Sequence, residues 1–265
     1  MSLKTWWTPP HKKHMKKIKE IIPLQLIAMY FFFTGDISFL NMLYVFFPSL
    51  SKTKNGIPTL FGKPFLTNGN IGDFLGLLRQ VVKKNQYHIE LIKDGDIIID
   101  AGANMGIFSI FVAHTYPNAT IYAFEPTPST FAILKENVKY YPNIKISDCG
   151  LGESEKIASV IIVGGSGGTG GENYIGEGGV PIEIKTIDSL NMRVDFLKMD
   201  VEGYEANILK GARETIKKYK PVVAMSAYHK LEDKKELPIL LKSICPEYVC
   251  ELHHDCDEDF ICHCD

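Results

Sequence analysis

Short runs of apolar, β-branched residues alternate along the chain with segments whose apolar positions have helical spacing. Residues 97–99 are three consecutive isoleucines, which predicts a strand buried on both faces of a parallel sheet. Residues 107–114 have the apolar spacing of a helix that packs on such a sheet. Residues 120–124 form a second strand-like run. Together these three segments predict a βαβ unit.

The turn after the first predicted strand has the composition of a ligand-binding turn. It runs from Asp100 through Gly102 to Gly106, and glycine lets the backbone approach a ligand closely. Glu125 ends the second predicted strand, where a carboxylate can accept hydrogen bonds from both hydroxyls of a ribose. The unit therefore predicts half of a nucleoside-cofactor site.

The order of residues in this turn favours one cofactor over another. A dinucleotide site uses G-x-G-x-x-G and places a helix N-terminus under a pyrophosphate, whereas this turn is Asp-x-Gly-x-x-x-Gly. The Asp100 carboxylate would repel a pyrophosphate but suits the ammonium of a methionine moiety, directly or through water. We therefore expect S-adenosylmethionine rather than NAD. A tight strand-to-helix turn without a ligand is the alternative.

Five motifs in a fixed order extend this pattern downstream. They are DAGANMG, AFEP, TIDSL, FLKMDVEGYE and ILKGA. In this order and spacing they resemble the FkbM-type family, a branch of the class I S-adenosylmethionine-dependent methyltransferases. The resemblance covers residues 94–228, about half of the chain.

The resemblance implies a fold and a set of cofactor contacts. The fold is a Rossmann-like, doubly wound α/β fold, with a seven-stranded, mostly parallel sheet that has a final antiparallel strand, and an N-terminal helical extension precedes it. The implied reaction is methyl transfer to a hydroxyl oxygen. The cofactor positions are Asp100, Gly102, Asn104 and Gly106 in the turn, Glu125 at the ribose, and Asp148 and Cys149 at the adenine edge.

Three residues are candidates for the acceptor side of the site. Asp200 ends the predicted fourth core strand, where the resemblance places it facing the methyl donor. Glu202 shares a face with Asp200 on a continuing strand, or else lies in the first turn of the next helix, where a carboxylate suits the helix dipole. His229 ends the predicted fifth core strand, residues 221–230, and an imidazole there could take the acceptor's proton. The alternative is a histidine that caps the strand or bonds a loop.

One position departs from the family pattern. The fifth strand often carries a glutamate in the family, whereas this chain has Met225 and Ser226. A carboxylate that shapes the acceptor site is therefore expected to be missing.

Length and charge agree with one such domain and additions to it. The 265 residues contain 29 basic and 31 acidic side chains, a formal net charge of −2. This balance argues against a nucleic-acid binder that relies on a large cationic surface. We divide the chain into a basic and apolar helical arm or cap at 1–54, a linker hairpin with a lead-in helix at 55–93, and the methyltransferase domain at 94–265.

The arm leaves two interpretations open. Clustered lysines precede two apolar stretches at residues 21–33 and 37–47, and neither reaches the roughly 20 residues that a spanning helix needs. The arm is either a cap that packs on the core or on a second subunit, or a peripheral membrane contact. We expect a cytoplasmic protein, membrane-associated only in the second case, with an undetermined oligomeric state.

Two further segments invite other interpretations. The glycine-rich run at 164–171 lacks the lysine and the helix of a phosphate-binding loop, which predicts a flexible connection between strands at 157–163 and 180–185. Five of the six cysteines lie between 245 and 264, without a C-x2-C pair. We expect a hairpin of strands at 248–253 and 260–264, cysteines that are small core residues of a reduced intracellular protein, and no metal site. Asp200 and Glu202 could ligate magnesium, but nothing in the sequence requires it.

The leading hypothesis is an S-adenosylmethionine-dependent O-methyltransferase that acts on a hydroxyl of a small molecule or glycan. A non-catalytic module that binds this cofactor is the second, and an NAD-dependent oxidoreductase is the third.

Overall fold

The computed structural model describes most of the chain after residue 58. It describes residues 59–61, 63–67, 71–78, 80–81, 85–162, 173–254 and 258–264. The chain divides into two units, residues 1–62 and 63–265, and the described part of the first contains only β1 (Thr59–Leu60) and one further residue. The predicted arm at 1–54 and the glycine-rich run at 164–171 lie outside the described residues.

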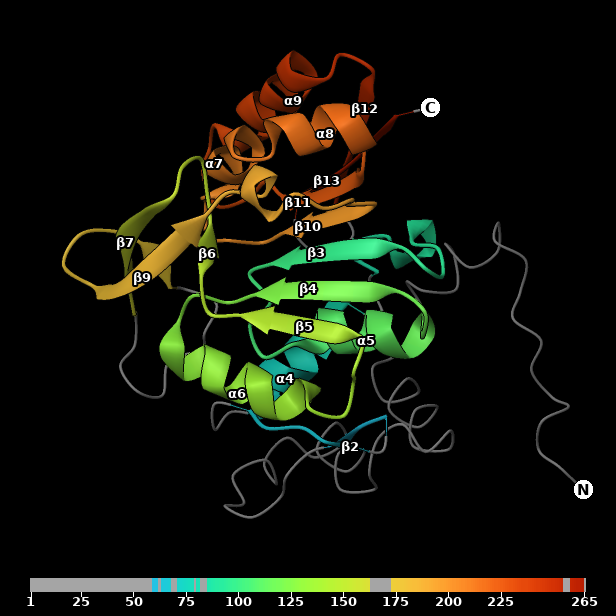
Figure 1. Ribbon diagram of the computed structural model, residues 1–265, viewed down its shortest axis with the longest axis vertical. Coiled ribbons are helices and arrows are strands. Elements are labelled where there is room, and N and C mark those ends of the chain that lie inside the picture. Colours follow the sequence, from blue (N-terminus) through green and yellow to red (C-terminus); the bar gives the residue numbers. More distant parts are fainter. Residues whose placement is uncertain are drawn as a thin grey trace, which may run out of the picture. The chain divides into compact units, whose positions relative to one another are not determined.

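The second unit is built on a seven-stranded sheet in the order β12-β13-β11-β10-β3-β4-β5 (Figure 1). Every pairing from β11 to β5 is parallel, and β13 is antiparallel to both of its neighbours. This arrangement confirms the predicted fold. The strands are β3 (Ile97–Ala101), β4 (Thr120–Phe124), β5 (Ile144–Ser147), β10 (Phe196–Met199), β11 (Val222–Ser226), β12 (Tyr248–His253) and β13 (Asp259–Cys264).

The isoleucine run explains why β3 lies at the centre of the sheet. Ile98 and Ile99 are fully buried, as expected for a strand covered on both faces. The register sets Asp100 beside Ala123 of β4 and beside Lys198 of β10. Because parallel strands end at the same edge of a sheet, the segments that follow β3, β4 and β10 meet at one edge.

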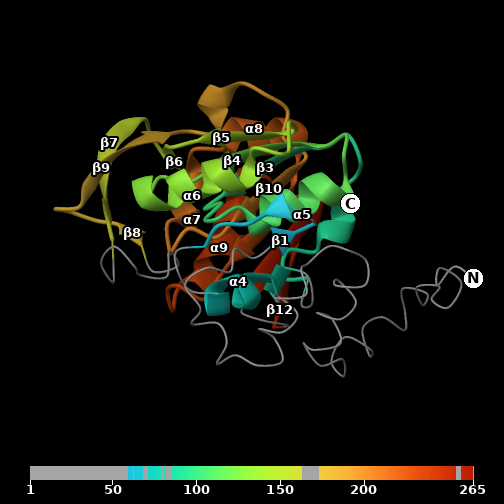
Figure 2. The same cartoon turned by 90° about the horizontal axis from the view of Figure 1, so that it is seen from below.

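The helices gather near the two halves of the sheet (Figure 1). The first group, near β4 and β5, is α5 (Ile107–Thr115) and α6 (Pro128–Val138). Figure 2 shows α4 (Ile71–Leu78) farther from these two strands. The second group, near β11 to β13, is α7 (Glu205–Lys210), α8 (Arg213–Tyr219) and α9 (Asp233–Ile244). The remaining short elements are β2 (Lys63–Pro64) and the 3-10 turns η4 (Ile89–Leu91) and η6 (Asp188–Leu190).

A second sheet projects from the carboxyl ends of the central strands (Figures 1 and 2). It has the order β6-β9-β7-β8, with a small apolar cluster formed by Val160, Ile182 and Ile184. The sequence predicted two of these strands and a hairpin between them, but not a separate sheet. Its strands are β6 (Gly150–Leu151), β7 (Lys156–Ile161), β8 (Tyr174–Ile175) and β9 (Val180–Lys185).

Two predictions about the C-terminal part need correction. β11 ends at Ser226 rather than continuing to residue 230, because both of its neighbours end there: β10 stops opposite Met225, and β13 begins opposite Ser226. His229 therefore lies in the following loop. The predicted hairpin is confirmed as β12 and β13, but a disulfide joins Cys250 to Cys262, so these cysteines are not reduced. The register explains the bond, because it sets the two residues directly opposite each other.

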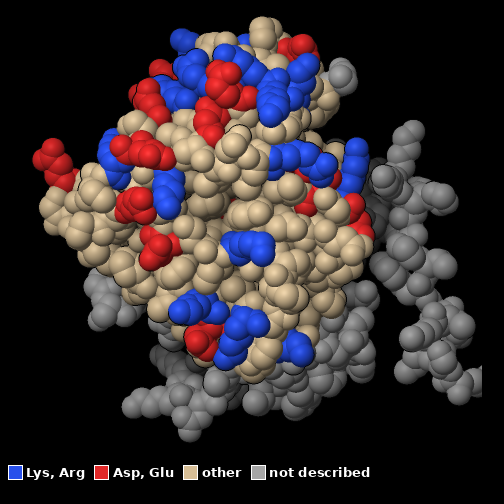
Figure 3. All heavy atoms as spheres, in the orientation of Figure 1, with Lys and Arg blue, Asp and Glu red and all other residues tan. Residues whose placement is uncertain are grey.

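The surface carries both signs of charge. On the face in Figure 3, basic and acidic side chains are interspersed around α8 and α9 rather than separated into one large cationic area. In the part of the chain that the structure describes, no helix is both long and apolar enough to cross a membrane.

Candidate active site

A cavity of about 290 Å³ opens at the carboxyl edge of β3, β4 and β10. The turn after β3 and the tip of β4 form one wall, and the loop after β10 forms another. Val160 and Ile175 of the second sheet also line it, as do Leu77, Gln80, Val81 and Tyr87 from the segment before β3. The second sheet therefore bounds a site that the central strands organise.

Glycine is required at two positions of the turn after β3. Gly102 has φ +74, and a Cβ there would lie 2.0 Å from the Asp200 carbonyl oxygen. Gly106 has φ +92, and a Cβ there would lie 2.7 Å from the Leu134 side chain. Both positions combine a left-handed backbone with close packing, which only glycine tolerates.

Glu125 is held where a cofactor ribose would need it. Its carboxylate is 7% exposed and accepts backbone N–H bonds from Asn104 (3.0 Å) and Thr127 (2.9 Å). Burial raises the pKa of Glu125 above its ordinary value. These hydrogen bonds and the charge of Lys198 lower the pKa, but by less than burial raises it. Both oxygens retain acceptor capacity, and Glu125 lines the cavity. The buried Asn104 Oδ1 beside it has no hydrogen-bond partner, so this wall fits a ligand that carries hydroxyl groups.

Asp100 has a different position from the one expected of a direct cofactor contact. It is fully buried, accepts a hydrogen bond from Ser109 Oγ (2.6 Å) and pairs with Lys198 Nζ (3.0 Å), and it does not line the cavity. Lys198 also donates to the carbonyls of Gly102 (2.8 Å) and Ala101 (3.3 Å). The buried pair therefore fixes the shape of the turn. Sequence reasoning did not single out Lys198, although a lysine inside the apolar strand β10 was a usable signal.

The two residues predicted at the adenine edge do not line the cavity. Asp148 is exposed, and Cys149 is buried in the core, where its Sγ lies 3.2 Å from Ser147 Oγ. Gly150 and Leu151, the next two residues, contribute to the lining instead. The predicted adenine contact at 148 and 149 stays a prediction.

Asp200 lies at the cavity with a hydroxyl on each carboxylate oxygen. Tyr87 donates to Oδ2 (2.8 Å) and Tyr228 donates to Oδ1 (3.2 Å). Burial, followed by the charge of Asp200, raises the pKa of Tyr87 well above its ordinary value, so this phenol stays a donor. Sequence reasoning missed both tyrosines. No local signal marks Tyr87, which is 113 residues from Asp200 in the chain.

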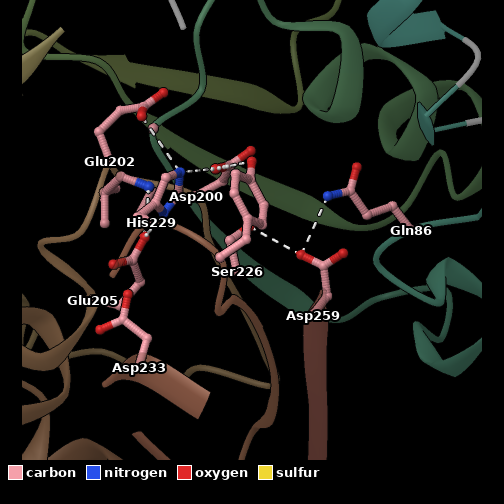
Figure 4. Close-up of polar contacts among 12 residues, drawn as sticks. Gln86, Asp200, Glu202, Glu205, Ser226, His229, Asp233 and Asp259 are labelled. Carbon is pink, nitrogen blue, oxygen red and sulfur yellow. Dashed lines mark hydrogen bonds and ion pairs between the residues drawn. The ribbon is translucent and has the colours of Figure 1, made fainter. Parts of the chain in front are cut away.

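His229 lies among three carboxylates (Figure 4). Its Nδ1 is 3.0 Å from Glu205 Oε1, and its Nε2 is 3.5 Å from Asp200 Oδ1 and 3.4 Å from Glu202 Oε2. Burial alone would lower the pKa of His229, but the hydrogen bond to Glu205 and the three negative charges raise it to about 9. The ring is therefore an imidazolium at neutral pH. This charge disfavours the role of proton acceptor considered from the sequence.

The structure places Glu202 in neither of the two positions considered for it, because β10 ends at Met199 and does not continue to Glu202. It has φ +54 and lies in the turn before α7, which begins at Glu205. Glu202 therefore lies outside the first turn of the helix, and its carboxylate reaches His229 beside Asp200. The acidic residue in that first turn is Glu205, which is fully buried and which the sequence did not single out.

The Asp259 carboxylate of β13 lies beside Ser226, one of the two residues that β11 has in place of the family's glutamate. Ser226 pairs with Asp259 across β11 and β13, and its Oγ donates to Asp259 Oδ1 (3.0 Å). Gln86 Nε2 donates to the same oxygen (3.2 Å), as Figure 4 shows. Asp259 is only 2% exposed, so β13 supplies a buried acid behind the acceptor side.

Comparisons with known proteins agree with this geometry. The chain is 27% identical over 177 residues to the methyltransferase sdnD of Sordaria araneosa, a match that covers 52% of this chain and 68% of that protein. It is 32% identical over 87 residues to the 31-O-demethyl-FK506 methyltransferase FkbM of Streptomyces tacrolimicus, covering 32% of this chain and 34% of that protein. It is 24% identical over 180 residues to the hexuronic acid methyltransferase AglP of Haloferax volcanii, covering 65% of this chain and 72% of that protein.

A solved structure and a family model complete the comparison. The crystal structure of a methyltransferase FkbM from Methylobacillus flagellatus KT has a TM-score of 0.52 and 19% identity, covering 94% of this chain and 60% of that one, and it supports the fold. The family model described as a methyltransferase FkbM domain matches residues 100–260, well over half of the chain. The chain therefore belongs to the FkbM family of methyltransferases, whose methyl donor is S-adenosylmethionine.

Proposed function

We propose that this protein transfers the methyl group of S-adenosylmethionine to a hydroxyl oxygen of a small molecule or glycan. The observation that carries the proposal is the Asp200 carboxylate, which lies at the cavity beside the cofactor turn. The name of one relative, a 31-O-demethyl-FK506 methyltransferase, supports a hydroxyl acceptor. The name of another, a hexuronic acid methyltransferase, supports a sugar acceptor, but a hexuronic acid carries a carboxylate that the acidic residues of this cavity disfavour.

The cofactor would be held mainly by the turn after β3 and by the tip of β4. Gly102 and Gly106 allow the backbone to approach it, Asn104 offers an unbonded amide oxygen, and Glu125 offers acceptors for the ribose hydroxyls. Asp100 acts through Lys198, which fixes the carbonyls of the turn. When bound, the cofactor supplies a methyl group on a sulfonium, a good leaving group.

Asp200 is the group that we assign to remove the acceptor's proton. Its Oδ1 lies 3.5 Å from Nε2 of the His229 imidazolium, and its side chain is 24% exposed, so an acceptor hydroxyl can reach it. Tyr87 fixes one of its oxygens, and the His229 ring fixes the carboxylates of Asp200 and Glu202 from the other side. These contacts hold the base in a fixed position. Because the methyl donor carries a good leaving group, this half of the site mainly has to align the acceptor and accept its proton.

The charges of the cavity favour an uncharged acceptor. Among the described residues that line it, Glu125, Asp200 and Glu202 are acidic, and Lys198 is basic but already bonded to Asp100 and to two carbonyls. A negatively charged acceptor would be repelled, whereas the apolar side chains of Val160 and Ile175 suit the body of a neutral alcohol.

The experiment is a transfer assay with methyl-labelled S-adenosylmethionine and a panel of neutral and anionic hydroxyl compounds. We expect labelled methyl ethers from neutral compounds with the wild type, and a turnover lower by about 10²-fold or more with Asp200→Asn. S-adenosylhomocysteine binding, measured in parallel, should be the same for both proteins. Full turnover in Asp200→Asn would contradict the assignment of the base. Cofactor binding without transfer to any acceptor would favour the non-catalytic module.

A further inference from the structure

Three possible metal ligands meet at the end of α9 and the open end of the β12–β13 hairpin. They are the thiols of Cys245 and Cys264 and the carboxylate of Glu247, and one ligand atom from each lies within 4.8 Å of the other two. Cys245 directly follows α9, Glu247 precedes β12, and Cys264 ends β13. In the described residues, this is the one group of three or more such side chains that meets this spacing.

This cluster lies at the opposite edge of the sheet from the cavity. Cys264 pairs with Tyr248, whose hydroxyl donates to the carbonyl of Pro221, just before β11 begins. Asp200 instead follows the carboxyl end of β10, which runs parallel to β11. Any ligand at the cluster is therefore separate from the methyl-transfer site.

The ligand set suits a borderline-soft divalent ion. Zinc is bound by thiolate, imidazole and carboxylate groups at about 2.3 Å from sulfur and about 2.0 Å from nitrogen or oxygen. In a tetrahedron of these bond lengths, ligand atoms lie roughly 3.5 Å apart, so side-chain shifts of about 1 Å would close the site. The last carbonyls of α9 add partial negative charge beside Cys245.

A cation already lies at this position. The Lys220 ammonium forms an ion pair with Glu247. A divalent ion would have to displace this ammonium, so Lys220 competes with the metal for the Glu247 carboxylate.

We propose that Cys245, Glu247 and Cys264 form a zinc site that stabilises the junction of α9 with the hairpin, with a water molecule as the fourth ligand. The C-x2-C rule missed it because the ligands follow the end of α9, precede β12 and end β13. The disulfide between Cys250 and Cys262 leaves Cys245 and Cys264 as free thiols in the same hairpin region.

The test uses the full chain without a histidine tag, freed of metal with a chelator, with its free thiols reduced. Zinc chloride and cobalt(II) are the probes, and bound metal is measured per chain after gel filtration. We expect one zinc per chain, an ultraviolet thiolate-to-cobalt charge-transfer band, and a higher melting temperature with zinc. S-adenosylhomocysteine binding should not change.

Matched variants separate this site from adventitious binding. Cys264→Ser and Glu247→Gln should each weaken zinc binding by about tenfold or more, whereas Cys149→Ser, which removes a free thiol of the core, should not. Glu247 is exposed, so its variant should fold even where a cysteine variant does not.

The sharpest variant is Lys220→Asn, which removes the competing ammonium and keeps a residue that tolerates the left-handed φ of +49. It should bind zinc several-fold more tightly. The proposal would be overturned by zinc binding that persists in Cys264→Ser, by an unchanged affinity in Lys220→Asn, by no zinc bound to the reduced wild type, or by a Cys245–Cys264 disulfide in the purified chain.

Discussion

The two halves of the active site are built in different ways. The cofactor half is one βαβ unit, in which two backbone N–H groups bond Glu125 and Asp100 pairs with Lys198, which reaches in from β10. The acceptor half joins distant segments, and in it one imidazolium and two phenols stabilise a cluster of carboxylates.

This difference predicts different consequences of mutation. Changes in the cofactor half disturb packing at the centre of the sheet, so they should cost stability and cofactor binding together. Changes in the acceptor half alter charge and alignment around Asp200, so they should mainly lower turnover or change its pH dependence.

The largest effect is expected from Gly102→Ala. Its Cβ would overlap the Asp200 carbonyl at 2.0 Å, so the variant should lose roughly 4 kcal/mol or more of unfolding free energy. Gly178→Ala is the control, because Gly178 also has a positive φ (+81) but has no atom within 4 Å of its Cβ position. That variant should lose about 1 kcal/mol. Equal losses in denaturant melts would show that the contact with Asp200 does not matter.

The next effect concerns the buried pair. Lys198→Met leaves Asp100 as an unpaired buried charge and should cost about 3 to 5 kcal/mol, with loss of S-adenosylhomocysteine binding. The double variant Asp100→Asn with Lys198→Met should be more stable than Lys198→Met alone. Additive losses in urea unfolding would mean that the two side chains do not act as a pair.

The pH dependence of stability should reveal the charge of His229. The pKa of His229 in the folded protein, about 9, lies above the ordinary value of 6.5. The charged ring therefore adds its full contribution to the free energy of unfolding below about pH 6.5, and this contribution is lost as the pH rises through about 9. A shift of this size corresponds to about 3 kcal/mol.

Glu205→Gln should therefore flatten the fall in unfolding free energy between pH 7 and 9. Glu236→Gln, on the exposed surface of α9, should keep the slope of the wild type. A wild-type slope in Glu205→Gln would mean that Glu205 does not raise the pKa of His229.

The smallest effects are expected from the two tyrosines. Tyr87→Phe removes a buried hydrogen bond to a charged group, worth about 2 kcal/mol, and should lower turnover by about tenfold or more. Tyr228 is 40% exposed, so water can replace its hydroxyl, and Tyr228→Phe should change turnover less. Turnover of both variants is measured at saturating cofactor. A lower turnover in Tyr228→Phe than in Tyr87→Phe would contradict this order.

The sequence predicted the parts of the molecule that depend on neighbouring residues. The isoleucine run located β3, the turn residues lie in one contiguous motif, and the period of two in the tail located β12 and β13. It could not reveal that Lys198 neutralises Asp100, or that Tyr87, Tyr228 and Glu205 surround Asp200 and His229. Those contacts depend on the register of β10 against β3 and on loop paths, which a linear pattern does not contain.

The cofactor half should bind S-adenosylmethionine independently of the acceptor half. The most direct test is calorimetric titration of the wild type and of Asp200→Asn with S-adenosylhomocysteine, with NADH as the control ligand. We expect equal, micromolar binding of S-adenosylhomocysteine by both proteins and no binding of NADH. Binding of NADH, or no binding of S-adenosylhomocysteine by the wild type, would contradict it.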